Sequence, residues 1–286
     1  MGKIIITADS VADLWPEAAA HYGVHIISLH LNIGDADCLA YPEIHKETLY
    51  EHFERTGELP RTAAVSPGEY EEFFRSFTQA GDEVIHISMS AALSCCHQNA
   101  LLAAETVENV SVVDSQNISV GTGMLALHAV RMADEGLARD EIVSRLEELR
   151  TRVTGGFIID QLTYLYKGGR CSALSCMGAN LLKLRPEIVV REGTMSVRKK
   201  YRGSYEKCLF AYIDDMFADL TGVDPAYLTV GHTLSDDDPL LAKAVDYMKA
   251  KGYFREIVVQ EAGAAVACHC GPNTFGMFYV TPAPAK

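Results

Sequence analysis

Short β-rich runs alternate with longer helical segments through the first half of this chain, and this alternation restricts the fold more than any other feature. The β-rich runs are Lys3–Thr7, Glu83–Ser88 and Val110–Val113. Segments with helical spacing of apolar residues lie between and after them, at about 45–55, 69–79, 95–107, 121–135 and 140–152. This order predicts an α/β domain in which helices cover both faces of a mainly parallel sheet.

The pattern changes after Gly155 and Gly156. A hairpin is predicted at about 189–197, helices at 204–220 and 239–251, and further strands at 227–231, 255–260 and 275–280. Such an order is typical of an α+β domain with a mixed sheet. We therefore expect an N-terminal α/β/α domain over residues 1–155 and a C-terminal domain over 156–286, with a ligand bound between them.

The composition indicates a globular protein that binds neither nucleic acid nor a membrane. The 286 residues are 48% hydrophobic, which is enough for a large core. A net charge of −13 disfavours anionic surfaces, because nucleic acids and acidic lipids attract clustered Lys and Arg. No apolar run approaches the ~20 residues of a transmembrane helix and no signal segment follows Met1, so we expect a cytoplasmic monomer without stable membrane insertion. The eight cysteines are expected to be reduced, packed thiols.

A glycine pair followed by arginine, Gly168-Gly169-Arg170, forms a candidate anion site after an apolar segment. Glycine permits a left-handed backbone that ends a helix sharply, so the Arg170 side chain would start from a defined point. Its guanidinium can bind a carboxylate or a phosphate through two parallel hydrogen bonds. The same motif also fits a plain helix C-cap followed by a solvated arginine.

Two serines mark predicted helix starts. Ser66-Pro-Gly-Glu69 has the pattern of a capping box and predicts a helix that begins at Pro67. Ser94 precedes another helical segment, where free backbone N–H groups can bind an anion. Ser94 and the loop residue Thr62 are therefore candidate ligand contacts, and a plain capping or turn role fits both as well.

Polar residues also occur at the predicted strand ends, where ligands of open α/β sheets bind. They are Asp9, Ser10, Asp114 and Ser115. Structural turns are equally common at these positions, so both roles stay open.

Cysteine and histidine occur together in Cys95-Cys96-His97 and Cys268-His269-Cys270. Zinc would need further ligands, such as Cys171 and Cys176, but Cys-x-x-Cys and His pairs at ligand spacing are absent, so we expect no metal. Cys95 at a helix start could instead act as a nucleophile, with His97 or His269 as its base. The chain has no Walker loop, Gly-x-Ser-x-Gly or Gly-x-Gly-x-x-Gly motif, and so no nucleotide-phosphate cradle of its own.

These motifs together resemble the DegV family of bacterial fatty-acid-binding proteins over nearly the whole chain. The matching segments, in order, are Asp9–Leu14, Thr62–Glu69, Leu93–Gln98, Asp114–Gly123, Tyr164–Ser172 and His269–Gly276. The family patterns are Asp-Ser-x-Ala-Asp-Leu, Thr-Ser-Gln-Pro-Ser-Pro-Gly-Glu, Leu-Ser-Gly-Thr-Tyr-Gln, Asp-Ser…Ser-x-Gly-x-Gly, Tyr-Leu-x-Lys-Gly-Gly-Arg-x-Ser and His-x-Gly-Pro…Gly. Two segments depart from them, since Ala63-Ala64-Val65 stands for Ser-Gln-Pro and Cys95-Cys96 for Gly-Thr.

The resemblance implies a carrier that buries a long-chain fatty acid in a tunnel and needs no cofactor. In the family, the residues that match Thr62 and Ser94 hold the carboxylate, and those that match Arg170 and His269 lie around it. The departure at Cys95 predicts that this thiol lies within contact range of the ligand head. The resemblance further implies a separate ATP-dependent fatty acid kinase, which phosphorylates the bound carboxylate for phospholipid synthesis. A Cys-dependent acyl hydrolase or transferase that uses the same tunnel is the alternative.

Overall fold

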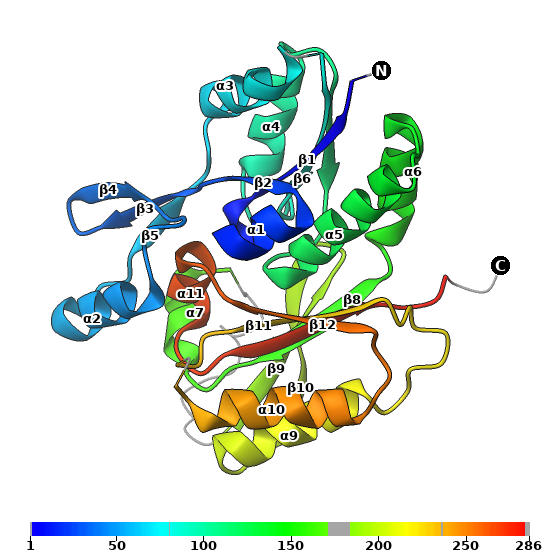
Figure 1. Cartoon of the computed structure of the whole chain (residues 1–286). Helices are drawn as coiled ribbons and strands as arrows, with labels where there is room; N and C mark the ends of the chain where they lie inside the picture. The colour runs from blue at the N-terminus through cyan, green and yellow to red at the C-terminus, as the bar shows by residue number, and fades with distance from the viewer. Residues whose placement is uncertain (1, 80, 171–183, 236, 284–286) are drawn as a thin grey trace.

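A computed structural model describes residues 2–79, 81–170, 184–235 and 237–283, and it confirms the predicted α/β class (Figure 1). The first sheet has four parallel strands, in the spatial order β2 (Val24–Ile27), β1 (Ile4–Asp9), β6 (Glu83–Ser88) and β7 (Val110–Asp114). All its pairings are parallel. The three strands that the sequence predicts for this half of the chain are therefore confirmed.

Helices cover both faces of the parallel sheet. They are α1 (Pro16–Tyr22), α3 (Pro67–Thr78), α4 (Cys96–Ala104), α5 (Val120–Asp134) and α6 (Arg139–Leu149). Val84 of β6 lies in a core with α3 and α4, whereas its neighbour Ile85 lies in a core with α5 and α6. This is the alternation that a strand buried on both faces requires.

The second sheet has six strands with parallel and antiparallel pairings. Their spatial order is β10 (Thr194–Arg202), β9 (Leu184–Arg191), β8 (Val153–Ile158), β13 (Phe275–Val280), β11 (Tyr227–His232) and β12 (Glu256–Glu261). Only β11 and β12 pair in parallel among the described strands of this sheet. Helices α9 (Tyr205–Met216) and α10 (Pro239–Ala250) contribute to one core, and α5 contacts this sheet as well as the first (Figure 1).

A small antiparallel sheet projects from one side of the molecule, next to α2 (Lys46–Thr56) (Figure 1). Its strands, in spatial order, are β4 (Ala36–Leu39), β3 (His30–Ile33) and β5 (Arg61–Ala63). Two short helices, α7 (Leu162–Gly168) and α11 (Ala264–Cys270), contact each other, and α11 also contacts α2 and β3. The sequence predicts neither this sheet nor α11, because their segments are too short for a clear period.

The capping box at Ser66 is confirmed. The Glu69 N–H donates to Ser66 Oγ at 3.3 Å, and the Ser66 N–H donates to a Glu69 carboxylate oxygen at 2.8 Å. Helix α3 begins at Pro67, as predicted.

Strand β8 is not predicted, because its two glycines have the appearance of a turn. A Cβ on Gly155 would lie 2.3 Å from the Met277 backbone oxygen, and one on Gly156 would lie 2.4 Å from that of Ile188. The glycines thus allow close approach of neighbouring strands. Because β8 begins at Val153 and crosses the expected boundary between 155 and 156, the division into two domains stays a prediction.

Candidate ligand-binding site

A cavity of about 440 Å³ lies beside the segments that follow the carboxyl ends of β1 and β6. Five residues that line it are the predicted site residues Thr62, Ser94, Cys95, Arg170 and His269. The rest of its lining is mostly apolar: Val11, Leu29, Ala63, Ala64, Met89, Ala91, Ala92, Leu93, Ile118 and Ala265. The structure therefore brings the five residues together from β5, the loop 89–95, the end of α7, and α11. We call this cavity the mouth.

Thr62 and His269 are joined by a hydrogen bond across 207 positions of sequence. Thr62 Oγ1 lies 3.1 Å from His269 Nε2, and His269 Nδ1 has no hydrogen-bond partner among the described residues. Burial, with a smaller contribution from the Arg170 charge, lowers the pKa of His269 to about 4. The imidazole is therefore neutral near pH 7, and it can accept a hydrogen bond on one nitrogen and donate one from the other.

The glycine pair has separate structural roles. Gly169 is the C-cap of α7 in a left-handed conformation, with φ of 70°, and its N–H donates to the Tyr166 carbonyl at 3.3 Å. A Cβ on Gly168 would lie 2.4 Å from His269 Nδ1, so only glycine lets the ring pack this closely against the helix end. Arg170 follows and donates to the Gly168 carbonyl at 2.8 Å. The predicted C-cap is thus confirmed, and Arg170 lines the mouth. Residues 171–183, which include the end of the same motif as well as Cys171 and Cys176, lie outside the described residues.

Ser94 caps α4 in a way that uses one of the expected free N–H groups. Its hydroxyl accepts from the Cys96 N–H at 3.2 Å. Helix α4 begins at Cys96, and Cys95 is its N-cap residue without a side-chain capping bond. The loop before it is held by turns in which the N–H groups of Leu93 and Ser94 donate to the Ser90 carbonyl, at 3.0 and 3.3 Å. Ser94 is therefore positioned by a compact turn, and its hydroxyl is engaged with the helix start.

The altered segments of the family pattern lie on the mouth. Ala63 and Ala64 line it beside Thr62, whereas Val65 is buried and its carbonyl accepts from Asn99 Nδ2 at 2.7 Å. Cys95 lines the mouth and is exposed, whereas Cys96 is buried. Methyl groups and a thiol thus stand where the family pattern has polar side chains or glycine.

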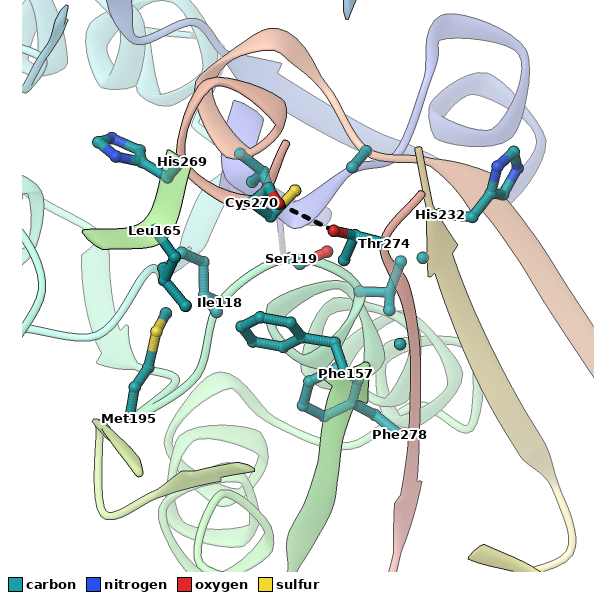
Figure 2. Close-up of a pocket in the computed structure, with 15 residues that line it drawn as sticks. Ile118, Ser119, Phe157, Leu165, Met195, His232, His269, Cys270, Thr274 and Phe278 are labelled. Atoms are coloured by element: carbon teal, nitrogen blue, oxygen red, sulfur yellow. Dashed lines mark hydrogen bonds between the residues drawn. The ribbon is translucent and has the colours of Figure 1, made fainter. Parts of the chain in front are cut away.

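A second, narrow cavity of about 40 Å³ lies next to the mouth and shares Ile118 and His269 with it. In Figure 2, the lining residues Phe157 and Phe278 lie near the centre of the view, and Ile118, Leu165 and Met195 lie on the same side of the view as His269. The remaining lining is Ser119, Val120, Gly231, His232, Ala262, Val266, Cys270, Thr274 and Gly276. We call it the apolar cavity. Sequence reasoning did not assign the apolar residues of this lining to a site, because apolar lining cannot be distinguished from core before the chain is folded.

Ser119 is the most unusual backbone position of the apolar cavity. Its φ of 57° and ψ of −145° fall in a region that residues other than glycine rarely adopt. Such a conformation costs about 1–3 kcal/mol and persists only where neighbouring contacts hold it. Here its hydroxyl shares a hydrogen bond of 2.5 Å with the Asp13 carboxyl group.

The Cys and His residues form no nucleophile–base pair within the described part of the chain. His97 Nδ1 is hydrogen-bonded to Ser88 Oγ at 2.9 Å, and His269 is bonded to Thr62. Burial raises the pKa of the Cys96 thiol to about 11 and that of Cys270 to about 12, so both are protonated near neutral pH. The described residues also contain no group of three or more metal-ligand side chains.

None of the helices in the described ranges is both long enough and apolar enough to cross a bilayer. A family model for the DegV family of uncharacterised proteins matches residues 3–282. A DegV domain-containing protein of Caldanaerobacter subterraneus is 32% identical over 281 residues, which are 98% of this chain and 99% of that protein.

Two solved structures are similar over almost their whole length. A DegV family protein from Thermus thermophilus, described for its fatty acid binding, has a TM-score of 0.89 and 27% identity over 98% of this chain and 99% of its own. DegV of Bacillus subtilis, described as a fatty acid binding protein, has a TM-score of 0.83 and 25% identity over 98% of this chain and all of its own. With these matches over nearly the full length, the chain belongs to the DegV family.

Proposed function

We propose that this protein is a carrier that binds one long-chain fatty acid, with the carboxylate in the mouth and the tail in the apolar cavity. The observation that carries the proposal is that Thr62, Ser94, Arg170 and His269 line one cavity, which shares two wall residues with an apolar one. Two similar structures described for fatty acid binding support the same ligand class.

The tail would supply most of the affinity. Burial of a sixteen-carbon chain provides of order 10 kcal/mol of gross transfer free energy at ~0.8 kcal/mol per methylene, before the costs of association. The apolar cavity, at about 40 Å³, is far smaller than the ~300–1,000 Å³ of a typical small-molecule pocket. Side chains such as Met195 and Leu165 must therefore move when a tail enters, and the flexible thioether of Met195 makes this inexpensive.

The head would be held by one cation and neutral hydrogen-bond donors. Arg170 supplies the charge, and the neutral imidazole of His269 and the hydroxyls of Thr62 and Ser94 can supply hydrogen bonds. Because the carboxylate would sit in the mouth, which the exposed Cys95 and Arg170 also line, a second protein could reach it. We infer that the partner is an ATP-dependent fatty acid kinase, which converts the carboxylate to an acyl phosphate for phospholipid synthesis. The carrier would act in the cytoplasm as a monomer, and its net charge of −13 disfavours adsorption to acidic lipid surfaces.

A Cys-dependent acyl hydrolase or transferase is the second candidate, because the exposed Cys95 lines the mouth. The hydrogen bonds of His97 to Ser88 and of His269 to Thr62 argue against it, since neither ring is bonded to the thiol.

The direct test is calorimetric titration of the lipid-free protein with palmitate and with 1-hexadecanol. We expect the acid to bind at least about tenfold more tightly, because only a carboxylate gains the charge-assisted bond to Arg170. Equal affinity for acid and alcohol would contradict the head assignment. Incubation with a long-chain acyl ester should give no turnover, and turnover that disappears after alkylation with iodoacetamide would instead support the hydrolase. Acyl phosphate formation with a purified fatty acid kinase and ATP tests the partner.

A further inference from the structure

The segment from Asp9 to Asp13 contributes Val11 to the lining of the mouth, whereas its polar side chains line neither cavity. Asp9 ends β1, and Ser10–Ala12 form a 3₁₀ turn. Asp9 is 0% exposed and Asp13 is 2% exposed, although unpaired carboxyl groups are rarely buried. Both therefore need specific partners, and those partners lie in the walls of the two cavities.

Asp9 is bonded to the start of the loop that carries Ser94. One of its carboxylate oxygens accepts from the Met89 N–H at 2.9 Å, and Met89 itself lines the mouth. The other accepts from the Tyr70 hydroxyl and lies 3.3 Å from His86 Nε2. The neighbouring Ser10 hydroxyl accepts from the N–H of Leu29, another mouth residue, at 3.1 Å. This segment is thus hydrogen-bonded to two residues that line the mouth, Met89 and Leu29.

Asp13 is bonded to two walls of the apolar cavity. One oxygen accepts from the Gly263 N–H at 2.9 Å, and Gly263 is the N-cap of α11, whose residues Val266 and Cys270 line that cavity. The other oxygen shares the hydrogen bond with Ser119, another residue that lines this cavity. Asp13 therefore joins the segment before α5 to the start of α11, and it holds Ser119 in its strained conformation.

We propose that Asp9 and Asp13 are positioning residues with separate roles in ligand selection. Asp9 fixes the wall of the mouth that would contact the carboxylate, and Asp13 fixes the walls of the apolar cavity around the tail. This inference rests on the proposed fatty acid binding. If Asp9 is lost, the 89–95 loop shifts and recognition of the carboxylate weakens. If Asp13 is lost, the walls around the tail become less fixed and each methylene gains fewer contacts.

The test uses ratios of affinities within one protein variant. The head ratio is the affinity for palmitate over that for 1-hexadecanol, and the tail step is the affinity gain from laurate to myristate to palmitate. A variant that is partly unfolded loses binding sites for all ligands equally, so neither ratio changes through a merely structural defect. Asp246→Ala, an exposed residue of α10, is the matched control and should leave both ratios unchanged.

We expect Asp9→Ala to lower the head ratio about fivefold or more with an unchanged tail step, because one bond that fixes the loop is lost. Asp13→Ala should lower the tail step, which can reach about 15-fold per two methylenes, to less than half its wild-type value. Because burial raises the pKa of Asp13 to about 8, it is a neutral acid at pH 7, and Asp13→Asn should make the same two hydrogen bonds and restore the tail step.

If Asp9→Ala does not fold, Asp9→Asn takes its place and should lower the head ratio by a smaller factor. If Asp13→Ala does not fold, Ser119→Ala takes its place and should lower the tail step by a smaller factor. Unchanged ratios, or a change of both ratios in every variant, would overturn the division of roles. A failure of the proposed function itself would be recognised in the wild-type protein, which would then bind no fatty acid.

Discussion

Replacement of Gly168 by alanine tests whether the close contact between the end of α7 and His269 matters for binding. The new Cβ would lie 2.4 Å from His269 Nδ1 and 3.3 Å from its Cγ. Real Cβ atoms do not approach other atoms to 2.4 Å, so the ring must move. Overpacking of this kind costs about 1–3 kcal/mol, partly offset by the ~1 kcal/mol higher helix propensity of alanine.

The displaced ring would lose its hydrogen bond to Thr62, which is 3.1 Å long in the wild-type protein. Loss of one such bond is worth about 1 kcal/mol, or roughly fivefold in affinity, and a shifted head wall adds to this. We therefore expect palmitate to bind Gly168→Ala about 5- to 30-fold more weakly by calorimetric titration.

Gly23→Ala is the matched control. Gly23 is the left-handed C-cap of α1, with φ of 73°, and a Cβ there meets nothing within 4 Å. The strained backbone should cost about 1–2 kcal/mol of stability, measured by urea denaturation, without a change in affinity. Wild-type affinity in Gly168→Ala, or an equal loss in both variants, would refute the role assigned to the contact between Gly168 and His269.

Three further predictions concern the Arg170 charge, the Cys95 thiol and the buried Asp13 carboxyl group. Arg170→Ala should weaken palmitate binding by about 2–3 kcal/mol, or roughly 30- to 150-fold, and an unchanged affinity would remove Arg170 from the head site. Bound palmitate or oleate should slow maleimide labelling of Cys95, as followed by peptide mass spectrometry, whereas equal rates would place the ligand head away from this thiol. Burial, with a smaller contribution from the nearby Glu261 charge, raises the pKa of Asp13 from its ordinary 3.8 to about 8. Between these two pKa values Asp13 keeps its proton in the folded protein and releases it in the unfolded chain. The contribution of Asp13 to the free energy of unfolding therefore decreases with rising pH, by at most ~1.4 kcal/mol per pH unit. Asp13→Asn removes this negative contribution, so the slope of the unfolding free energy against pH, measured by urea denaturation between about pH 4 and 8, should become more positive than in the wild-type protein, and an identical slope would contradict the buried neutral acid.

The fold class could be predicted because it depends on local periodicity. The runs at β1, β6 and β7 are rich in isoleucine and valine, and the helices around them are long enough to show their period. Strand β8 could not be predicted, because the tertiary reason for its glycines is the close approach of neighbouring strands. Helix α11 could not be predicted either, because a seven-residue run of alanine, valine, cysteine and one histidine is compatible with several structures.

The residues of the mouth could be proposed from their resemblance to a family, but not from local sequence alone. Thr62 and His269 lie 207 positions apart, and nothing in either segment predicts that they are hydrogen-bonded. The apolar lining could not be predicted from the sequence for a different reason, since Ile118 and Met195 differ from core residues only in facing a cavity. The polar partners of Asp9 and Asp13 likewise depend on contacts between distant segments.

The most direct test of fatty acid carriage is organic extraction of the purified protein, followed by mass spectrometry of the extract and of the intact protein under native conditions. We predict close to one long-chain fatty acid per chain, seen as a matching mass increase of the native protein and as a free acid in the extract. Arg170→Ala, purified in parallel, should carry less. Wild-type protein that is free of lipid, and that takes up no palmitate or oleate when these are supplied, would contradict the proposed function.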